Sequence, residues 1–92
     1  MAKNPLITLI QAQERQQGGA LLLDVRSAEE HQEWHPAGSV SVPVERLAEE
    51  IGRLGNRNQP VLLFCSSGGR SQMAAQVLRR LGYNNLYIVR KE

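Results

Sequence analysis

The sequence predicts an α/β fold with a mainly parallel sheet, because strand patterns and helix patterns alternate along the chain. Two short runs, residues 20–25 and 61–64, are apolar at nearly every position, which is typical of parallel strands buried on both faces. Two capping boxes, at 8–11 and 27–30, mark helix starts on either side of the first run. An amphipathic stretch from Ser71 follows the second run.

The first half of the chain begins with a helix and a strand. The capping box at 8–11 predicts a helix that runs to about Gln17, where two glycines end it. Residues 20–25 form the first predicted strand. The capping box at 27–30 then opens a short helical turn towards Trp34.

In the middle of the chain the predicted helices and strands are shorter and are interrupted by prolines and glycines. Residues 36–38 contain a proline and a glycine that interrupt it, and 39–42 predicts a short strand that Pro43 stops. A helix is predicted from Glu45, because apolar residues recur there at helical spacing. These residues are Leu47, Ala48, Ile51 and Leu54. Residues 55–60 form a turn-rich loop.

The second half contains the clearest pattern. Residues 61–64 predict a second buried strand, and the helix from Ser71 carries one apolar stripe and ends before Gly82. The stripe consists of Met73, Ala74, Val77, Leu78 and Leu81. Residues 86–89 predict the last strand. In an open parallel sheet ligands bind at the carboxyl ends of strands, and Cys65 lies at such an end.

The composition indicates one small globular domain spanning residues 1–92, with 41% hydrophobic and 22% charged residues. No apolar run approaches the ~18 residues of a membrane span, and the N-terminus lacks the apolar core of a signal peptide. A single cysteine cannot form an internal disulfide, which agrees with a cytoplasmic location. The net charge of +2 comes from scattered arginines, and the four aromatic residues and lack of a basic stripe argue against nucleic-acid binding.

Cys65 is followed by a loop and a helix start that suit a reactive thiolate. Backbone N–H groups and a helix N-terminus around a thiol lower its pKa. Gly68 and Gly69 permit the backbone angles of a tight turn, Arg70 adds a cation near its mouth, and Ser71 can cap the helix. The same residues have plainer interpretations, in which Cys65 is a core residue and the glycines form an ordinary strand-to-helix turn.

Four segments resemble a single-domain rhodanese of the thiosulfate sulfurtransferase family. Leu-Leu-Asp-Val-Arg at 22–26 resembles the family's Asp-Val-Arg strand end, and Ser-Ala-Glu-Glu at 27–30 stands in place of its Ser-Pro-Glu-Glu. Residues 35–43 resemble its His-Ile-Pro-Gly-Ala-x-x-x-Pro segment, with the proline one place early. Residues 65–71 match its Cys-x-x-Gly-x-Arg-Ser loop, and 81–89 resembles the stretch that leads into its last core strand.

The resemblance implies a five-stranded parallel sheet flanked by helices on both faces, and transfer of sulfane sulfur without a cofactor or metal. Cys65 would attack thiosulfate or another sulfane sulfur donor and become a persulfide, and a thiol or cyanide would accept the outer sulfur. Arg70 would help to attract the anionic donor. The residues whose amides would hold the persulfide are Ser66, Ser67, Gly68, Gly69, Arg70 and Ser71.

Several polar residues are expected to support this site. Asp24 and Arg26 are interpreted as a structural pair that braces the Cys65 loop, in preference to direct chemistry. His35 either lines the pocket or is a satisfied loop histidine, and His31 is expected to be solvated. Trp34 is expected to be a partly buried packing residue. The two histidines and one cysteine do not have the spacing of a zinc site.

One departure and three alternatives accompany the resemblance. Family members usually continue after the last strand with a Gly-Gly turn and a helix, whereas residues 88–92 end the sequence, so we expect that helix to be missing here. Two explanations stay open: the sequence is trimmed from a longer one, or a homodimer covers the exposed face. A cysteine phosphatase or an arsenate reductase is disfavoured, because those families place five residues between cysteine and arginine and here four intervene. A disulfide oxidoreductase would need a second cysteine. A non-catalytic sulfur carrier or protein-interaction module of the same family stays open.

Overall fold

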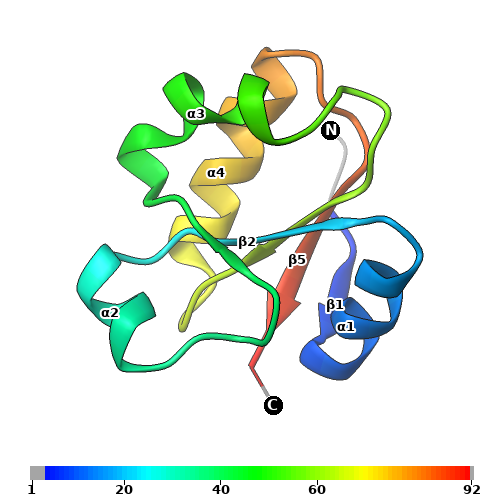
Figure 1. The fold of residues 1–92 in the computed structure, drawn as a ribbon. Coiled ribbons are helices and arrows are strands. Elements are labelled where there is room, and N and C mark those ends of the chain that lie inside the picture. The colour runs from blue at the N-terminus through cyan, green and yellow to red at the C-terminus, as the bar shows by residue number, and fades with distance from the viewer. Residues whose placement is uncertain (1–3, 92) are drawn as a thin grey trace.

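The computed structural model describes residues 4–91, which form one sheet of five parallel strands surrounded by helices (Figure 1). The strands are β1 (Leu6–Thr8), β2 (Leu21–Asp24), β3 (Val40–Ser41), β4 (Val61–Phe64) and β5 (Leu86–Arg90), in the spatial order β1-β5-β4-β2-β3. The helices are α1 (Leu9–Gln17), α2 (Ala28–Glu33), α3 (Leu47–Leu54) and α4 (Gly69–Arg80). All four strand pairings are parallel, which confirms the predicted fold class.

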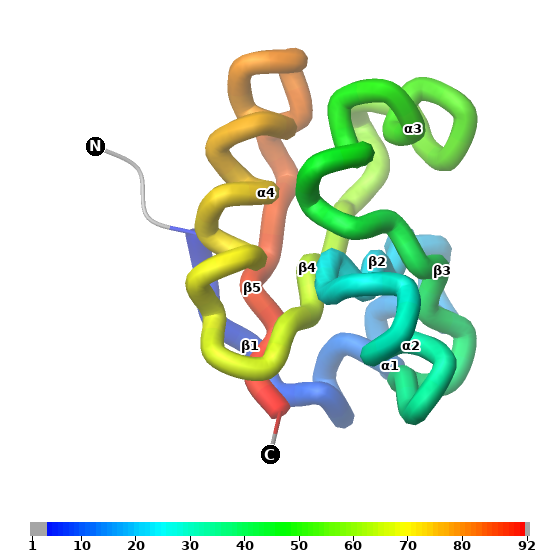
Figure 2. The backbone as a smooth tube through the Cα atoms, turned by 90° about the vertical axis from the view of Figure 1, so that its left-hand side faces the viewer, coloured from blue at the N-terminus to red at the C-terminus, as the bar shows by residue number. Residues whose placement is uncertain are grey.

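Helices lie on both sides of the sheet (Figure 2), and two groups of apolar side chains bury its two faces. The strands contribute Leu23, Leu63 and Ile88 on the face covered by α3 and α4, and Leu22, Leu62 and Val89 on the face covered by α1. Successive residues of a strand point to opposite faces, so the inner strands need apolar side chains at every position. The prediction of helices on both faces is confirmed.

Both predicted capping boxes are formed. The Oγ1 atom of Thr8 accepts a hydrogen bond from the backbone N–H of Gln11 at 3.1 Å, and Oε1 of Gln11 accepts one from the N–H of Thr8 at 2.9 Å. Ser27 and Glu30 form the equivalent pair at 3.2 and 3.0 Å. Each box satisfies N–H groups that the first turn of a helix leaves unpaired, so α1 and α2 begin where the sequence predicts.

Strand β1 is not predicted by the sequence. It pairs with β5, from Leu6 opposite Ile88 to Thr8 opposite Arg90. Three residues are too few to show a strand period, and Thr8 is already the N-cap of α1. Because β1 occupies the edge of the sheet, β5 lies in its interior although it is the last strand in the chain.

Helix α4 begins earlier than the sequence predicts. Its first residue is Gly69 and its N-cap is Gly68, whose φ of 90° lies in the left-handed region that glycine adopts without strain. The interpretation of Ser71 as the cap is therefore wrong, and its hydroxyl instead donates to the carbonyl oxygen of Leu63 at 3.1 Å. The helix predicted from Glu45 also differs, since it begins with a 3₁₀ turn, Val44–Arg46, before α3.

Candidate active site

Cys65 lies at the carboxyl end of β4, as the sequence predicts. All four residues of β4 are buried, and β2 and β5 pair with it on either side. The side chain of Cys65 packs in the core between the sheet and α4 and is 1% exposed. A cleft of about 680 Å³ borders Cys65 and reaches across the ends of β1 and β5. The thiol therefore lies at the bottom of a space that can hold a small ligand.

Backbone N–H groups of the loop after β4 point at the sulfur of Cys65. The amides of Gly68 and Ser71 donate hydrogen bonds to Sγ at 2.9 and 3.4 Å. Burial raises the pKa of the Cys65 thiol, but hydrogen bonds from Ser71, Gly68 and Ser67 outweigh it and hold that pKa below its ordinary value. These groups lie at the N-terminus of α4, whose dipole also favours negative charge. The loop stabilises an anion on the sulfur or on an atom bonded to it.

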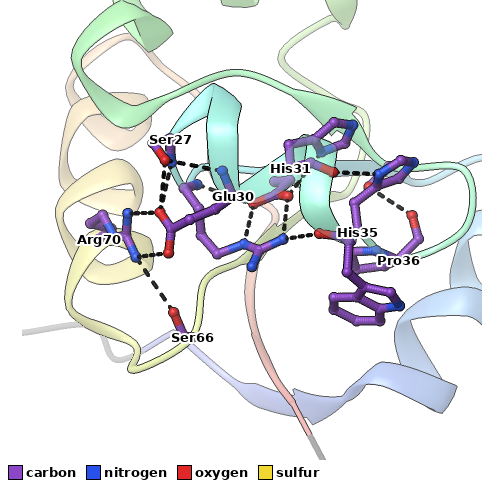
Figure 3. A network of polar contacts seen from close by, with 11 residues as sticks. Ser27, Glu30, His31, His35, Pro36, Ser66 and Arg70 are labelled. Atoms are coloured by element: carbon purple, nitrogen blue, oxygen red, sulfur yellow. Dashed lines mark hydrogen bonds and ion pairs between the residues drawn. The ribbon is translucent and has the colours of Figure 1, made fainter.

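The guanidinium of Arg70 is held by Glu30 of α2 (Figure 3). Nη1 and Nη2 of Arg70 donate to the two carboxylate oxygens at 2.7 and 3.2 Å, and Nη2 lies 3.4 Å from Oγ of Ser66. Hydrogen bonds from Arg70 and from the N–H of Ser27 hold the pKa of Glu30 at about 2. Sequence reasoning missed this pair, because the capping box already explains Glu30. Attraction of the donor by Arg70 stays a prediction.

Asp24 is a buried carboxylate with partners on two segments. Nε and Nη2 of Arg26 each donate to it at 2.9 Å, and Nδ1 of His31 lies 2.9 Å from its Oδ2. Arg26 also donates to the carbonyl oxygen of Trp34 at 2.6 Å. The expected structural pair of Asp24 and Arg26 is therefore present. Its connection to the Cys65 loop runs through α2, which carries both His31 and Glu30.

The two histidines stack on each other outside the lining of the cleft (Figure 3). Their ring centroids are 3.7 Å apart, and Nδ1 of His35 donates to the carbonyl oxygen of His31 at 2.7 Å. His35 is thus a satisfied loop histidine. The expectation that His31 is solvated is wrong, since its side chain is 16% exposed and contacts Asp24. Trp34 packs edge-on against Phe64, with 5.9 Å between ring centroids, but it is 44% exposed, so the expectation of a partly buried residue is wrong.

The cleft also has a wall that sequence reasoning missed. Opposite the Cys65 loop it is lined by Leu6, Ile88, Val89, Arg90 and Lys91. The signal for this wall is the strand register, which the sequence alone does not provide. Within residues 4–91 no group of three or more His, Cys, Asp or Glu side chains is placed to hold a metal ion. No helix in the same range is long and apolar enough to cross a membrane.

Comparison with known proteins places these features in one family. The family model for the rhodanese-like domain matches residues 8–91. The thiosulfate sulfurtransferase GlpE of Pseudomonas savastanoi pv. phaseolicola is 34% identical over 79 residues, which cover 86% of this chain and 74% of that protein. The putative sulfur carrier protein YrkF of Bacillus subtilis is 34% identical over 65 residues, or 71% of this chain, and the chain spans about a third (35%) of its length.

A solved structure agrees in fold over nearly the whole chain. The human single-domain sulfurtransferase TSTD1 superposes with a TM-score of 0.79 at 25% sequence identity. The superposition covers 95% of this chain and 89% of that protein. The chain therefore belongs to the rhodanese-like domain family, as the resemblance of its motifs predicts.

Proposed function

We propose that the chain is a sulfurtransferase domain that carries sulfane sulfur as a persulfide on Cys65. The thiolate attacks the outer sulfur of thiosulfate, the S–S bond of the donor breaks, and sulfite leaves with the bonding electron pair. Cyanide or a thiolate then attacks the outer sulfur of the persulfide. Thiocyanate or a new persulfide leaves, and the Cys65 thiolate is restored.

The observation that carries the proposal is the pair of backbone N–H groups of Gly68 and Ser71 directed at Sγ of Cys65. They stabilise the attacking thiolate, and as fixed donors at a helix N-terminus they also suit the negative charge of a persulfide. Four residues separate Cys65 from Arg70, which makes a tighter loop than a tetrahedral oxyanion needs. The hypothesis of a phosphatase or an arsenate reductase is therefore less favoured than that of a sulfurtransferase.

A sulfur carrier that does not turn over is the second candidate, favoured by the similarity to the putative sulfur carrier YrkF. Such a carrier would need the same anion-stabilising loop. It would differ from an enzyme in the second step, the release of the outer sulfur to a small acceptor.

The proposal is tested by intact-mass analysis after incubation with thiosulfate, with Cys65→Ser as the control. We expect the wild-type mass to rise by about 32 Da, one sulfur on a nucleophilic cysteine, and the variant to stay unchanged. Lack of an adduct on the wild type would contradict the proposal. Added cyanide then separates the candidates, because an enzyme releases its outer sulfur as thiocyanate over many cycles, whereas the persulfide of a carrier persists in the presence of cyanide.

The partners follow from this chemistry. We propose an anionic sulfane sulfur donor such as thiosulfate and a thiol or cyanide acceptor. The single free cysteine of the described residues suits a reducing compartment such as the cytoplasm. The homodimer that the sequence leaves open stays a prediction, which analytical ultracentrifugation tests.

A further inference from the structure

The cleft in front of Cys65 is larger than an inorganic sulfur donor requires. Its volume of about 680 Å³ lies within the size range of protein sites that hold organic molecules. Thiosulfate or cyanide would fill only the part of the cleft next to Sγ. The rest of the cleft therefore has room for the carbon skeleton of an organic substrate.

Gly69 leaves this room open beside the sulfur. It is the first residue of α4 and lines the cleft, and a Cβ atom added to it would meet no atom within 4 Å. Unlike Gly68, it does not have the positive φ that favours glycine. Glycine is also less favourable in a helix than a residue with a side chain. Neither the backbone nor the packing accounts for glycine here, whereas a side chain would project into the cleft that Cys65 borders.

Leu6 supplies an apolar wall on the opposite side of the cleft. Its side chain is 56% exposed although its backbone is fixed in the sheet. The N–H of Ile88 donates to the carbonyl oxygen of Pro5 at 2.9 Å, and Leu6 itself lies opposite Ile88. A ligand that covers this side chain removes apolar surface from water, which is favourable. The wall therefore suits the apolar part of a substrate.

We propose that the cleft takes an organic thiol with an apolar group near its sulfur, as the acceptor of the outer sulfur of the Cys65 persulfide. Gly69 and Leu6 are specificity-determining residues, since Gly69 leaves the room and Leu6 contacts the apolar group. The thiolate of the acceptor attacks the outer sulfur, the S–S bond to Sγ breaks, and its electron pair stays on Sγ. An organic persulfide leaves. This inference rests on the sulfurtransferase function proposed above.

Alkylation of Cys65 tests the shape of the cleft separately from sulfur transfer. Iodoacetamide and N-phenyliodoacetamide both react with the thiolate and displace iodide, and neither is charged, but only the second carries an apolar ring. The ratio of their second-order rate constants, phenyl reagent over iodoacetamide, cancels changes in the nucleophilicity of the thiolate. We expect a higher ratio for the wild-type chain than for N-acetylcysteine, whose thiol has no cleft around it.

We expect Gly69→Val to lower this ratio about ten-fold, because a β-branched side chain is stiff and fills the space that the ring needs. Leu6→Ala should lower it about three-fold, since part of the apolar contact is lost. The matched control is Gly52→Val, at a helical glycine of α3 whose Cβ position is equally open and which does not line the cleft. This control should leave the ratio unchanged, and urea denaturation should show both valine variants to be folded.

An unchanged ratio in Gly69→Val or in Leu6→Ala overturns the inference, and so does a wild-type ratio no higher than that of N-acetylcysteine. The class of acceptor is tested on the persulfide-loaded chain with benzyl mercaptan and 2-mercaptoethanol. Gly69→Val should slow transfer to benzyl mercaptan more than transfer to 2-mercaptoethanol, and equal slowing would contradict an apolar acceptor.

The alkylation result does not depend on sulfur transfer, because alkylation needs only the thiolate of Cys65. Failure of the proposed function would instead appear as a wild-type chain that takes up no sulfur from thiosulfate. The two failures are therefore distinguishable.

Discussion

At the scale of single residues, the hydroxyl of Ser71 has two possible acceptors. The residue is fully buried, and its Oγ donates to the carbonyl oxygen of Leu63 at 3.1 Å. Burial raises the pKa of Cys65, and the side chain of Ser71 is the largest of the contacts that lower it. A hydroxyl has one proton to donate, and a charged acceptor forms the stronger hydrogen bond. We therefore expect ionisation of Cys65 to draw the proton of the Ser71 hydroxyl from the carbonyl oxygen of Leu63 towards the sulfur.

Replacement of Ser71 by alanine is expected to raise the pKa of Cys65, because it removes this donor and leaves the backbone N–H groups in place. The measurement is the pH dependence of iodoacetamide alkylation, whose inflection should move to higher pH. We expect a stability loss of about 1 kcal/mol from the hydrogen bond to Leu63. Ser66→Ala, at an exposed position of the same loop, is the control. An inflection that does not move would mean that the backbone alone sets the pKa.

The sequence predicts the position of the reactive residues better than their contacts. Cys65 at a strand end and a glycine in the turn follow from local patterns, and both are present in the structure. The role of Ser71 was predicted wrongly because the left-handed Gly68 starts α4 early and turns the hydroxyl inward. The partial burial of His31 depends on its contact with Asp24, seven residues away on another element, and no short-range pattern encodes that contact.

At the scale of elements, α2 connects the buried end of β2 to the Cys65 loop. His31 at one end of the connection contacts Asp24, and Glu30 beside it holds Arg70. Helix α2 has six residues and buries none of them, so it has little apolar packing to keep it in place. The polar contacts and the Ser27 capping box take over that role. The position of Arg70 therefore depends on the ionisation of Glu30.

We expect low pH to break the ion pair between Glu30 of α2 and Arg70 of the Cys65 loop. The pKa of Glu30 is lowered to about 2 from its usual 4.5, so its contribution to stability is complete above pH 4.5 and is lost as pH falls towards 2. Hydrogen bonds from Arg26 and His31 outweigh burial and also lower the pKa of Asp24, which adds a loss in the same direction. Urea unfolding at decreasing pH should show a smaller loss of stability in Glu30→Gln than in the wild type.

The control for this pH dependence is Glu29→Gln, which changes an exposed carboxylate in the same helical turn. It should follow the wild-type curve below pH 4.5. Identical curves for Glu30→Gln and the wild type would contradict a stabilising ion pair between Glu30 and Arg70.

The sequence correctly predicts those helices and strands that carry a capping box or an apolar run within their own residues. Both capping boxes formed where predicted, and the apolar runs of β2 and β4 became inner strands. Strand β1 lacks such a signal, because it is three residues long and only Ile7 of it is buried. It exists through its pairing with β5, which lies about 80 residues further along the chain.

At the scale of the whole molecule, the sheet is completed by its last strand. β5 pairs with β1 on one side and with β4 on the other, and it contributes Ile88 to one core and Val89 to the other. Without β5, β1 would have no partner in the sheet. The wall of the cleft opposite Cys65 would be lost as well, since much of it belongs to β5. Fold and site therefore depend on the same strand.

This dependence predicts losses of stability of very different size for two residues that face each other across strands. Leu6 and Ile88 are paired in register, but Leu6 is 56% exposed and Ile88 only 1%. We expect Ile88→Ala to reduce the free energy of unfolding by about 2–5 kcal/mol, because it opens a cavity in the core that also contains Cys65. Leu6→Ala should reduce it by less than about 1 kcal/mol, since the side chain buries little apolar area. Urea denaturation measures both, and equal losses would contradict an interior β5 with β1 at the edge.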